Sequence, residues 1–145
     1  VDIFHKIWFK VALETHGSKL QVWMKNIDEL TLSPKPPSST MKTDFNMLDT
    51  IISKLEKAKI SLKVVVFNDE DFLYAKTVHQ RYPNVPFFVQ VGNDDLQTSA
   101  TATLREHLFV KYEWLIEKVM NDEEMNFVRV LPQLHTYIWG NKRGV

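Results

Sequence analysis

The pattern of apolar positions predicts five short strands separated by helices. The predicted strands cover residues 11–14, 30–33, 61–67, 86–91 and 127–131. Three of these segments are near-continuous apolar runs rather than alternations of apolar and polar positions. Runs of this kind are typical of strands that are buried on both faces of a parallel sheet.

Helical spacing of apolar residues occupies the segments between these strands. It predicts helices over residues 44–59, 69–81 and 99–121, and a short helix near the start of the chain, over residues 3–8. Thr43 or Asp44 is the expected N-cap of the first long helix. Residues 18–26 fit either a short helix or an irregular loop.

This alternation of strands and helices predicts an α/β fold in a single domain, residues 1–145. Strands joined by helices form right-handed βαβ units, which build a parallel sheet. Such a sheet either forms part of a (β/α) barrel or lies open as a doubly wound sheet. Hydrophobic periodicity does not separate the two.

Polar residues follow each predicted strand, and parallel α/β folds bind ligands at the carboxyl ends of their strands. These polar segments cover residues 14–17, 33–37, 68–71, 90–95 and 132–135. Lys35 stands between two prolines, whose restricted backbone holds a cation in place for a carboxylate or phosphate. Glu14 suits either hydrogen bonds from ribose hydroxyls or a cap on the following turn. Asn68 is an expected helix N-cap, and His16 and His135 are the histidines nearest the predicted site.

Composition excludes several classes of protein. Eighteen Lys and Arg balance eighteen Asp and Glu, so there is no general electrostatic attraction to nucleic acid or to an anionic membrane. The absence of cysteine excludes disulfides, thiol nucleophiles and a Cys-held cluster within these residues. The apolar runs are far shorter than the ~20 residues of a membrane-spanning helix. No HxH, HExxH, GxGxxG, Walker A or GxSxG spacing is present, which argues against an all-protein metal site and the common nucleotide and hydrolase sites.

The last residues, 139–145, are short, polar and cationic. They form either a disordered end or a terminus that folds back over the strand ends. In the second case Lys142 and Arg143 are the expected contacts to an anionic ligand.

Five segments together resemble a known family. They read ALET, SPKPPS, SLKVVVFNDE, QVGNDD and VLPQLH, in this order along the chain, starting at residues 12, 33, 61, 90 and 130. In this order they resemble the C-terminal part of the 7-carboxy-7-deazaguanine synthases, a family of radical S-adenosylmethionine enzymes. The likeness spans essentially the whole chain and is closest to the Gram-positive type.

The resemblance implies a modified, incomplete (β/α) barrel and a radical reaction. In the family, a 4Fe-4S cluster held by N-terminal cysteines cleaves S-adenosylmethionine reductively, and the radical abstracts hydrogen from 6-carboxy-5,6,7,8-tetrahydropterin. A ring contraction that depends on Mg²⁺ then gives 7-carboxy-7-deazaguanine, on the route to queuosine and related deazapurines. The expected location is the cytoplasm.

The resemblance also assigns site residues. It implies that S-adenosylmethionine is contacted by residues at two strand ends and by a carboxylate facing its ribose: Ser33, Pro34, Lys35, Gln90, Val91, Gly92, Asn93 and Glu14. The C-terminal end reaches the substrate in relatives, so His135, Trp139 and Val145 are the substrate-binding candidates.

The cysteine motif, the Gly-rich motif and the early substrate and Mg²⁺ residues of the family are absent from this chain. We therefore expect a C-terminal fragment that is inactive alone and holds no cluster or metal stably. The missing strands would leave one sheet edge unpaired, so we expect that edge to pair with added chain or with another copy in a homo-oligomer. We expect no nucleic-acid or membrane partner.

Two other functions are also compatible with the sequence. One is a fragment of an organic-radical activating enzyme that acts on a protein, which would have a docking groove in place of a closed pocket. The other is a complete, non-catalytic α/β binding module.

Overall fold

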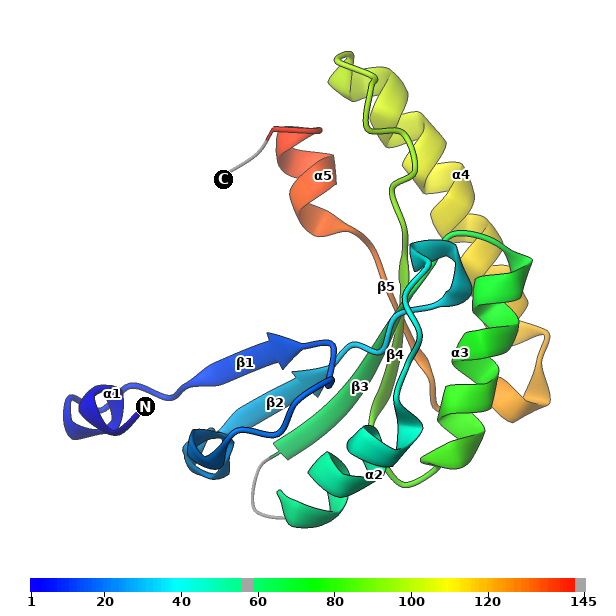
Figure 1. Ribbon diagram of the computed structural model, residues 1–145. Coiled ribbons are helices and arrows are strands. Elements are labelled where there is room, and N and C mark those ends of the chain that lie inside the picture. The colour runs from blue at the N-terminus through cyan, green and yellow to red at the C-terminus, as the bar shows by residue number, and fades with distance from the viewer. Residues whose placement is uncertain (56–58, 143–145) are drawn as a thin grey trace.

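The computed structural model describes residues 1–55 and 59–142 (Figure 1). Within these residues, five strands form one sheet whose neighbours all run parallel. The strands are β1 (Ala12–Thr15), β2 (Glu29–Leu32), β3 (Lys59–Val66), β4 (Phe87–Val91) and β5 (Arg129–Leu131). The α-helices are α1 (Asp2–Lys6), α2 (Phe45–Lys54), α3 (Asp69–Arg81), α4 (Thr101–Met120) and α5 (Leu134–Trp139). Short 3-10 helices are η1 (Val22–Asn26), η2 (Pro37–Ser39) and η3 (Glu123–Met125).

The strands lie in the sheet in the order in which they occur in the sequence, β1-β2-β3-β4-β5. A doubly wound sheet reverses its strand order at a switch point, and no reversal occurs among these strands. Right-handed crossovers between consecutive strands bring each connecting helix to the same face. Figure 1 shows α2, α3 and α4 on one face of a curved sheet. The arrangement is that of part of a (β/α) barrel.

The hydrophobic core lies between the sheet and these helices. Alternate residues of the central strands are fully buried toward the helices, among them Leu62, Val64 and Val66 of β3. Leu48 and Ile51 of α2 are fully buried, as are Ala75 and Val78 of α3, and these residues belong to the same cluster. The apolar runs therefore supply one continuous helix–sheet interface.

The opposite face of the sheet is less buried than the sequence predicted. In β3 and β4 the residues between the buried ones are only half-buried, giving the alternation of a strand covered on one face. The expectation of strands buried on both faces was wrong for the described residues, because every long helix packs on the same side. This half-covered surface, which carries Glu14, Thr31, Lys63 and Gln90, is called the open face below.

The predicted N-caps of two helices are confirmed. The Asp44 side chain caps α2 by accepting from the Met47 N–H at 3.1 Å, and Asn68 caps α3 by accepting from the Asp71 N–H at 3.0 Å. Helix α2 ends earlier than predicted, at Lys54, and Lys59 already begins β3. Residues 22–26 of the ambiguous segment form the 3-10 helix η1.

Helix α1, near the start of the chain, does not pack into the hydrophobic core. Helix α1 has no buried residue, and polar contacts to residues near β2 hold it: His5 Nε2 lies 2.9 Å from Asp28 Oδ2, and Asn26 donates to Asp2 at 3.0 Å. Strand β1 beside it pairs with β2 and is an outer strand of the described sheet. The pairing expected for its other edge stays a prediction.

No helix in residues 1–55 or 59–142 combines the length and the apolar character needed to cross a membrane.

Truncating the centre of the core should destabilise the protein strongly. Leu62→Ala removes a side chain that is 0% exposed on β3, and we expect it to lower the free energy of unfolding by about 2–5 kcal/mol. Urea denaturation followed by circular dichroism measures the loss. Leu73→Ala, on the exposed side of α3, is the matched control and should cost less than about 1 kcal/mol. Equal losses in the two variants would contradict the assignment of the core.

Candidate functional site

Parallel pairing brings the polar strand ends to one edge of the sheet, as predicted. The ladder continues past β2 and β4, because the Ser33 N–H donates to the Thr15 carbonyl at 2.7 Å and the Gly92 N–H donates to the Val66 carbonyl at 2.9 Å. The residues that follow β1, β2, β3 and β4 therefore start from neighbouring positions. We call this edge the rim.

The loop after β2 is held tightly at the rim. Ser33, Pro34 and Pro36 are buried, whereas Lys35 is partly exposed. The Thr43 hydroxyl donates to the Lys35 carbonyl at 3.2 Å and also bonds the Tyr74 hydroxyl. The prolines and this hydrogen bond fix the backbone around the lysine, as its sequence context predicted.

A surface pocket of about 470 Å³ lies beside Lys35, between the loop after β2 and the helices α2 and α3. Lys42, Thr43, Phe45 and Tyr74 also line it. Burial raises the pKa of the Tyr74 phenol, with the hydrogen bond to Thr43 acting in the other direction. The pocket is therefore lined by two lysines, Lys35 and Lys42, and by the hydroxyls of Thr40, Thr43 and Tyr74.

Asp71 of α3 connects the rim loops that follow β2 and β3. This carboxylate is fully buried. One oxygen accepts from the Ser38 N–H at 3.1 Å, and the other accepts from the Phe67 N–H at 3.0 Å. Both bonds satisfy backbone donors that have no partner in a helix or strand, so Asp71 fixes the position of one loop relative to the other. The sequence placed this residue only in the polar segment 68–71, after the third predicted strand.

The end of β4 is the second predicted contact segment. Gln90 lies on the open face, and its amide donates to the Pro132 carbonyl at 3.1 Å, which links β4 to the end of β5. Val91 is buried on the helix side. At Gly92 a Cβ atom would lie 2.4 Å from the Phe67 ring, so any larger residue here would force that ring to move.

Asn93 is 9% exposed and already engaged within the protein. Its Oδ1 accepts from the Asp95 N–H at 3.1 Å, and its Nδ2 donates to Asn141 Oδ1 at 2.8 Å. An amide carries two N–H donors, so one N–H of Asn93 has no partner within residues 1–55 and 59–142 and is available to a ligand. The side chain serves first to shape the rim.

Glu14 projects from β1 onto the open face. It pairs with Lys63 of β3 at 2.7 Å, across the intervening strand β2. Lys63 is nearly covered, with 15% of its side chain exposed, whereas 53% of the Glu14 side chain is exposed. The carboxylate thus keeps free acceptor positions for a ligand. Sequence reasoning missed Lys63, although a lone lysine inside an apolar strand is itself a signal of a polar sheet face.

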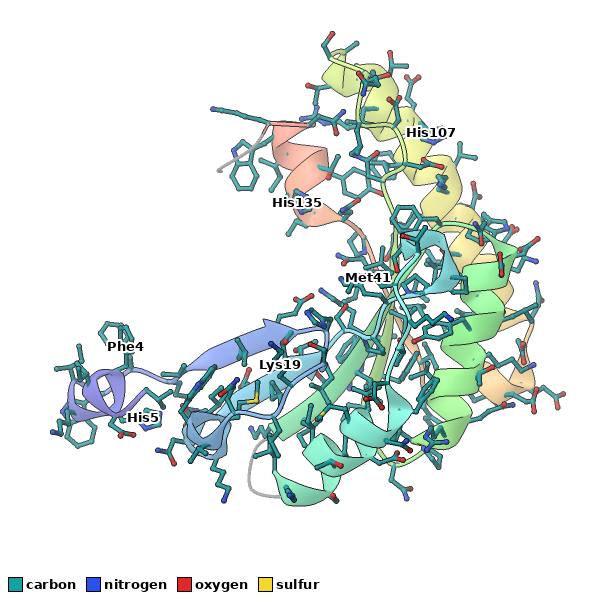
Figure 2. The ribbon with its side chains drawn as sticks, viewed as in Figure 1. Phe4, His5, Lys19, Met41, His107 and His135 are labelled. Atoms are coloured by element: carbon teal, nitrogen blue, oxygen red, sulfur yellow. The ribbon has the colours of Figure 1, made fainter. Side chains whose placement is uncertain are left out.

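The chain after β5 forms a helix that the sequence did not predict. Helix α5 carries His135, which is exposed, and Figure 2 shows it on a different helix from His107 of α4. His16 is also exposed, directly before Gly17. The tail folds back as far as Asn141, which contacts the loop after β4. Of the predicted tail contacts, Lys142 is exposed, and Arg143 and Val145 lie outside the described residues.

Charged partners surround the loop after β4. Lys111 approaches Asp94 at 2.6 Å and His107 lies 3.2 Å from the same carboxylate. Burial acts to raise the pKa of Asp94, but hydrogen bonds from these two residues outweigh it and lower the pKa below its usual value. Hydrogen bonding by Thr98 lowers the pKa of Asp95. Both carboxyl groups are therefore ionised at neutral pH.

Comparison with known proteins finds relatives over the entire chain. A 7-carboxy-7-deazaguanine synthase of Bacillus cereus is 63% identical over 145 residues, which cover 100% of this chain and 61% of that protein. The enzyme of the same name from Bacillus subtilis is 57% identical over 149 residues, with the same two coverages. This chain is homologous to the 7-carboxy-7-deazaguanine synthases throughout its length. It spans less than two thirds of the length of these relatives, and no family model matches it.

These matches do not favour the two alternative functions, an organic-radical activating enzyme and a non-catalytic binding module. Both relatives carry the synthase name that the sequence motifs predicted. The resemblance to the 7-carboxy-7-deazaguanine synthases is therefore confirmed.

The residues of this chain fit the cofactors that the sequence resemblance implies unequally. Glu14, Lys63 and Gln90 give the open face polar groups near strand ends, which suits a nucleoside such as that of S-adenosylmethionine. An iron–sulfur cluster does not fit, because the sequence has no cysteine. The described residues also contain no group of three or more His, Asp or Glu that could hold a metal ion.

Removing the negative charge of Asp71 should loosen the rim. Asp71→Asn places an NH₂ group against a backbone N–H and weakens the other bond, so we expect a loss of about 2–4 kcal/mol in the free energy of unfolding. Asp69→Asn, two residues earlier, is the matched control. Asp69 pairs with Lys118 at the surface, and that change should cost less than about 1 kcal/mol.

Thermal or urea denaturation of both variants measures the two losses in the free energy of unfolding. A loss at Asp71 no larger than the loss at Asp69 would show that the buried carboxylate does not hold the loops.

Proposed function

We propose that this chain is the C-terminal part of a 7-carboxy-7-deazaguanine synthase. The whole enzyme would be a radical S-adenosylmethionine lyase that converts 6-carboxy-5,6,7,8-tetrahydropterin to 7-carboxy-7-deazaguanine in the cytoplasm, for queuosine and related deazapurines. The observation that carries the proposal is 63% identity over 145 residues to a protein of that name. The matched region is the whole chain, so it includes the open face and the rim as well as the core.

In this proposal the chain supplies one wall of the cofactor site. S-adenosylmethionine supplies the radical when it is bound. Ser33, Pro34 and Lys35 contact it from the loop after β2, and residues 90–93 contact it from the end of β4. Support comes from the fixed backbones of these two segments and from their common position on the rim.

Glu14 is proposed to accept hydrogen bonds from the ribose hydroxyls. Its pairing with Lys63 orients the carboxylate, and its exposed oxygen is an acceptor. A ribose diol offers two donors, which suits a carboxylate. Mutual neutralisation of the pair also avoids an unpaired charge beside the sheet.

The substrate 6-carboxy-5,6,7,8-tetrahydropterin is proposed to approach from the side of α5. Its carboxylate requires cations or N–H donors, and His135 and Lys142 are both exposed there. Trp139 and Val145 are further candidates. We assign the cluster and Mg²⁺ to the portion of the relatives that this chain does not match.

The free edge of β1 is proposed to be paired in the whole protein. An outer strand presents unpaired backbone N–H and C=O groups, and β1 pairs with β2 along its other side. Either the unmatched portion of the enzyme or a second copy in a homo-oligomer would satisfy these groups.

A chimeric enzyme tests the function directly. This chain replaces the matching segment of the Bacillus subtilis relative, which is 57% identical, and the cluster is reconstituted without oxygen. We expect the chimera to form 7-carboxy-7-deazaguanine at a rate within about ten-fold of the relative, a difference of about 1.4 kcal/mol in activation free energy. The 145-residue chain alone should form none.

Lys35→Met in the chimera should weaken S-adenosylmethionine binding about ten-fold, by removing a charged hydrogen-bond donor. Lys54→Met, on an exposed position at the end of α2, is the matched control and should leave binding unchanged.

A folded chimera that forms no product, beside an active parent enzyme, would overturn the proposed function.

A further inference from the structure

The chain after α5 turns back onto the loop between β4 and α4. Asn141 makes three hydrogen bonds there. Its Nδ2 donates to the carbonyl oxygens of Asp95 and Thr98, each at 2.9 Å, and its Oδ1 accepts from Asn93 Nδ2 at 2.8 Å. Both N–H donors of the Asn141 side chain are thus used within the protein.

The loop itself has no regular structure, since residues 92–100 belong to no helix or strand. Side chains shape it instead. Asn93 Oδ1 accepts from the Asp95 N–H at 3.1 Å, and Asp95 Oδ1 accepts from the N–H groups of Gln97 and Thr98 at 3.2 and 2.9 Å. The Asn141 side chain bonds to Asn93 and to the carbonyl oxygens of Asp95 and Thr98, so it ties the start of this loop to its middle.

Helix α5 holds Asn141 in position. Arg105 of α4 donates to the carbonyl oxygens of Tyr137 and Ile138, and the Tyr137 hydroxyl donates to the Leu108 carbonyl at 3.2 Å. Gly140 then turns the chain with φ of +62°, against Thr101, where a side chain would be strained. The amide of Asn141 is therefore placed by packing of α5 on α4.

We infer that Asn141 is a positioning residue for cofactor binding. It fixes the loop whose first residues, 92 and 93, belong to the segment 90–93 of the proposed contact to S-adenosylmethionine. This inference rests on the proposed function. It assigns to the tail a role in holding the cofactor wall, separate from any contact of the tail with substrate.

Asn141→Asp tests the inference with almost no change in shape. The new carboxylate has no N–H donor and faces two carbonyl oxygens, so the loop should open. Asn84→Asp, in the exposed turn between α3 and β4, is the matched control. Hydrogen exchange of the 145-residue chain should become faster at the amides of Asp95, Gln97 and Thr98 in the first variant and stay unchanged in the second.

Isothermal titration of the chimera with S-adenosylmethionine gives the second measurement. We expect Asn141→Asp to bind about ten-fold or more weakly, with unchanged binding for Asn84→Asp. The loss should shrink as the pH falls, because the carboxyl group introduced at position 141 regains one donor when it is protonated. A general loss of folding would not recover in this way.

Outcomes separate the inference from the function on which it rests. Unchanged affinity in Asn141→Asp, in a chimera that binds the cofactor, overturns the positioning role. Faster loop exchange with unchanged affinity overturns it as well. A chimera with native Asn141 that does not bind S-adenosylmethionine overturns the proposed function itself.

Discussion

Parallel pairing of consecutive strands is the constraint on which the rest of this structure depends. Because crossovers between parallel strands are right-handed as a rule and no strand is skipped, α2, α3 and α4 all cover the same face of the sheet (Figure 1). The other face keeps polar residues such as Glu14, Lys63 and Gln90. The same pairing brings the strand ends to one rim, so the fold creates a polar face and the loops that border it together.

Loops at the rim take their shape from side-chain to backbone hydrogen bonds. Asp71 holds the loops after β2 and β3, and Asn141 holds the loop after β4. A buried polar group that satisfies backbone donors or acceptors is costly to remove, since each partner is then left without a bond. Residues distant in sequence can therefore control the geometry of a contact segment without touching a ligand.

The sequence predicted the order of elements and the site edge, but not every contact. Long periodic segments such as α3 and the caps Asp44 and Asn68 could be predicted, because spacing and capping chemistry are local. Helix α5 could not, since it is only six residues long and too short for a periodic apolar pattern. The exposure of one sheet face was missed because apolar runs do not reveal how many helices pack on each side. The roles of Asp71 and Asn141 depend on partners many residues away.

The most direct test of this account is a crystal structure of the chimera with S-adenosylmethionine. We expect the cofactor to lie over the open face at the ends of β2 and β4, in contact with residues 33–35 and 90–93. A cofactor bound elsewhere, such as in the surface groove between α3 and α4 lined by Asp69 and Trp114, would contradict it.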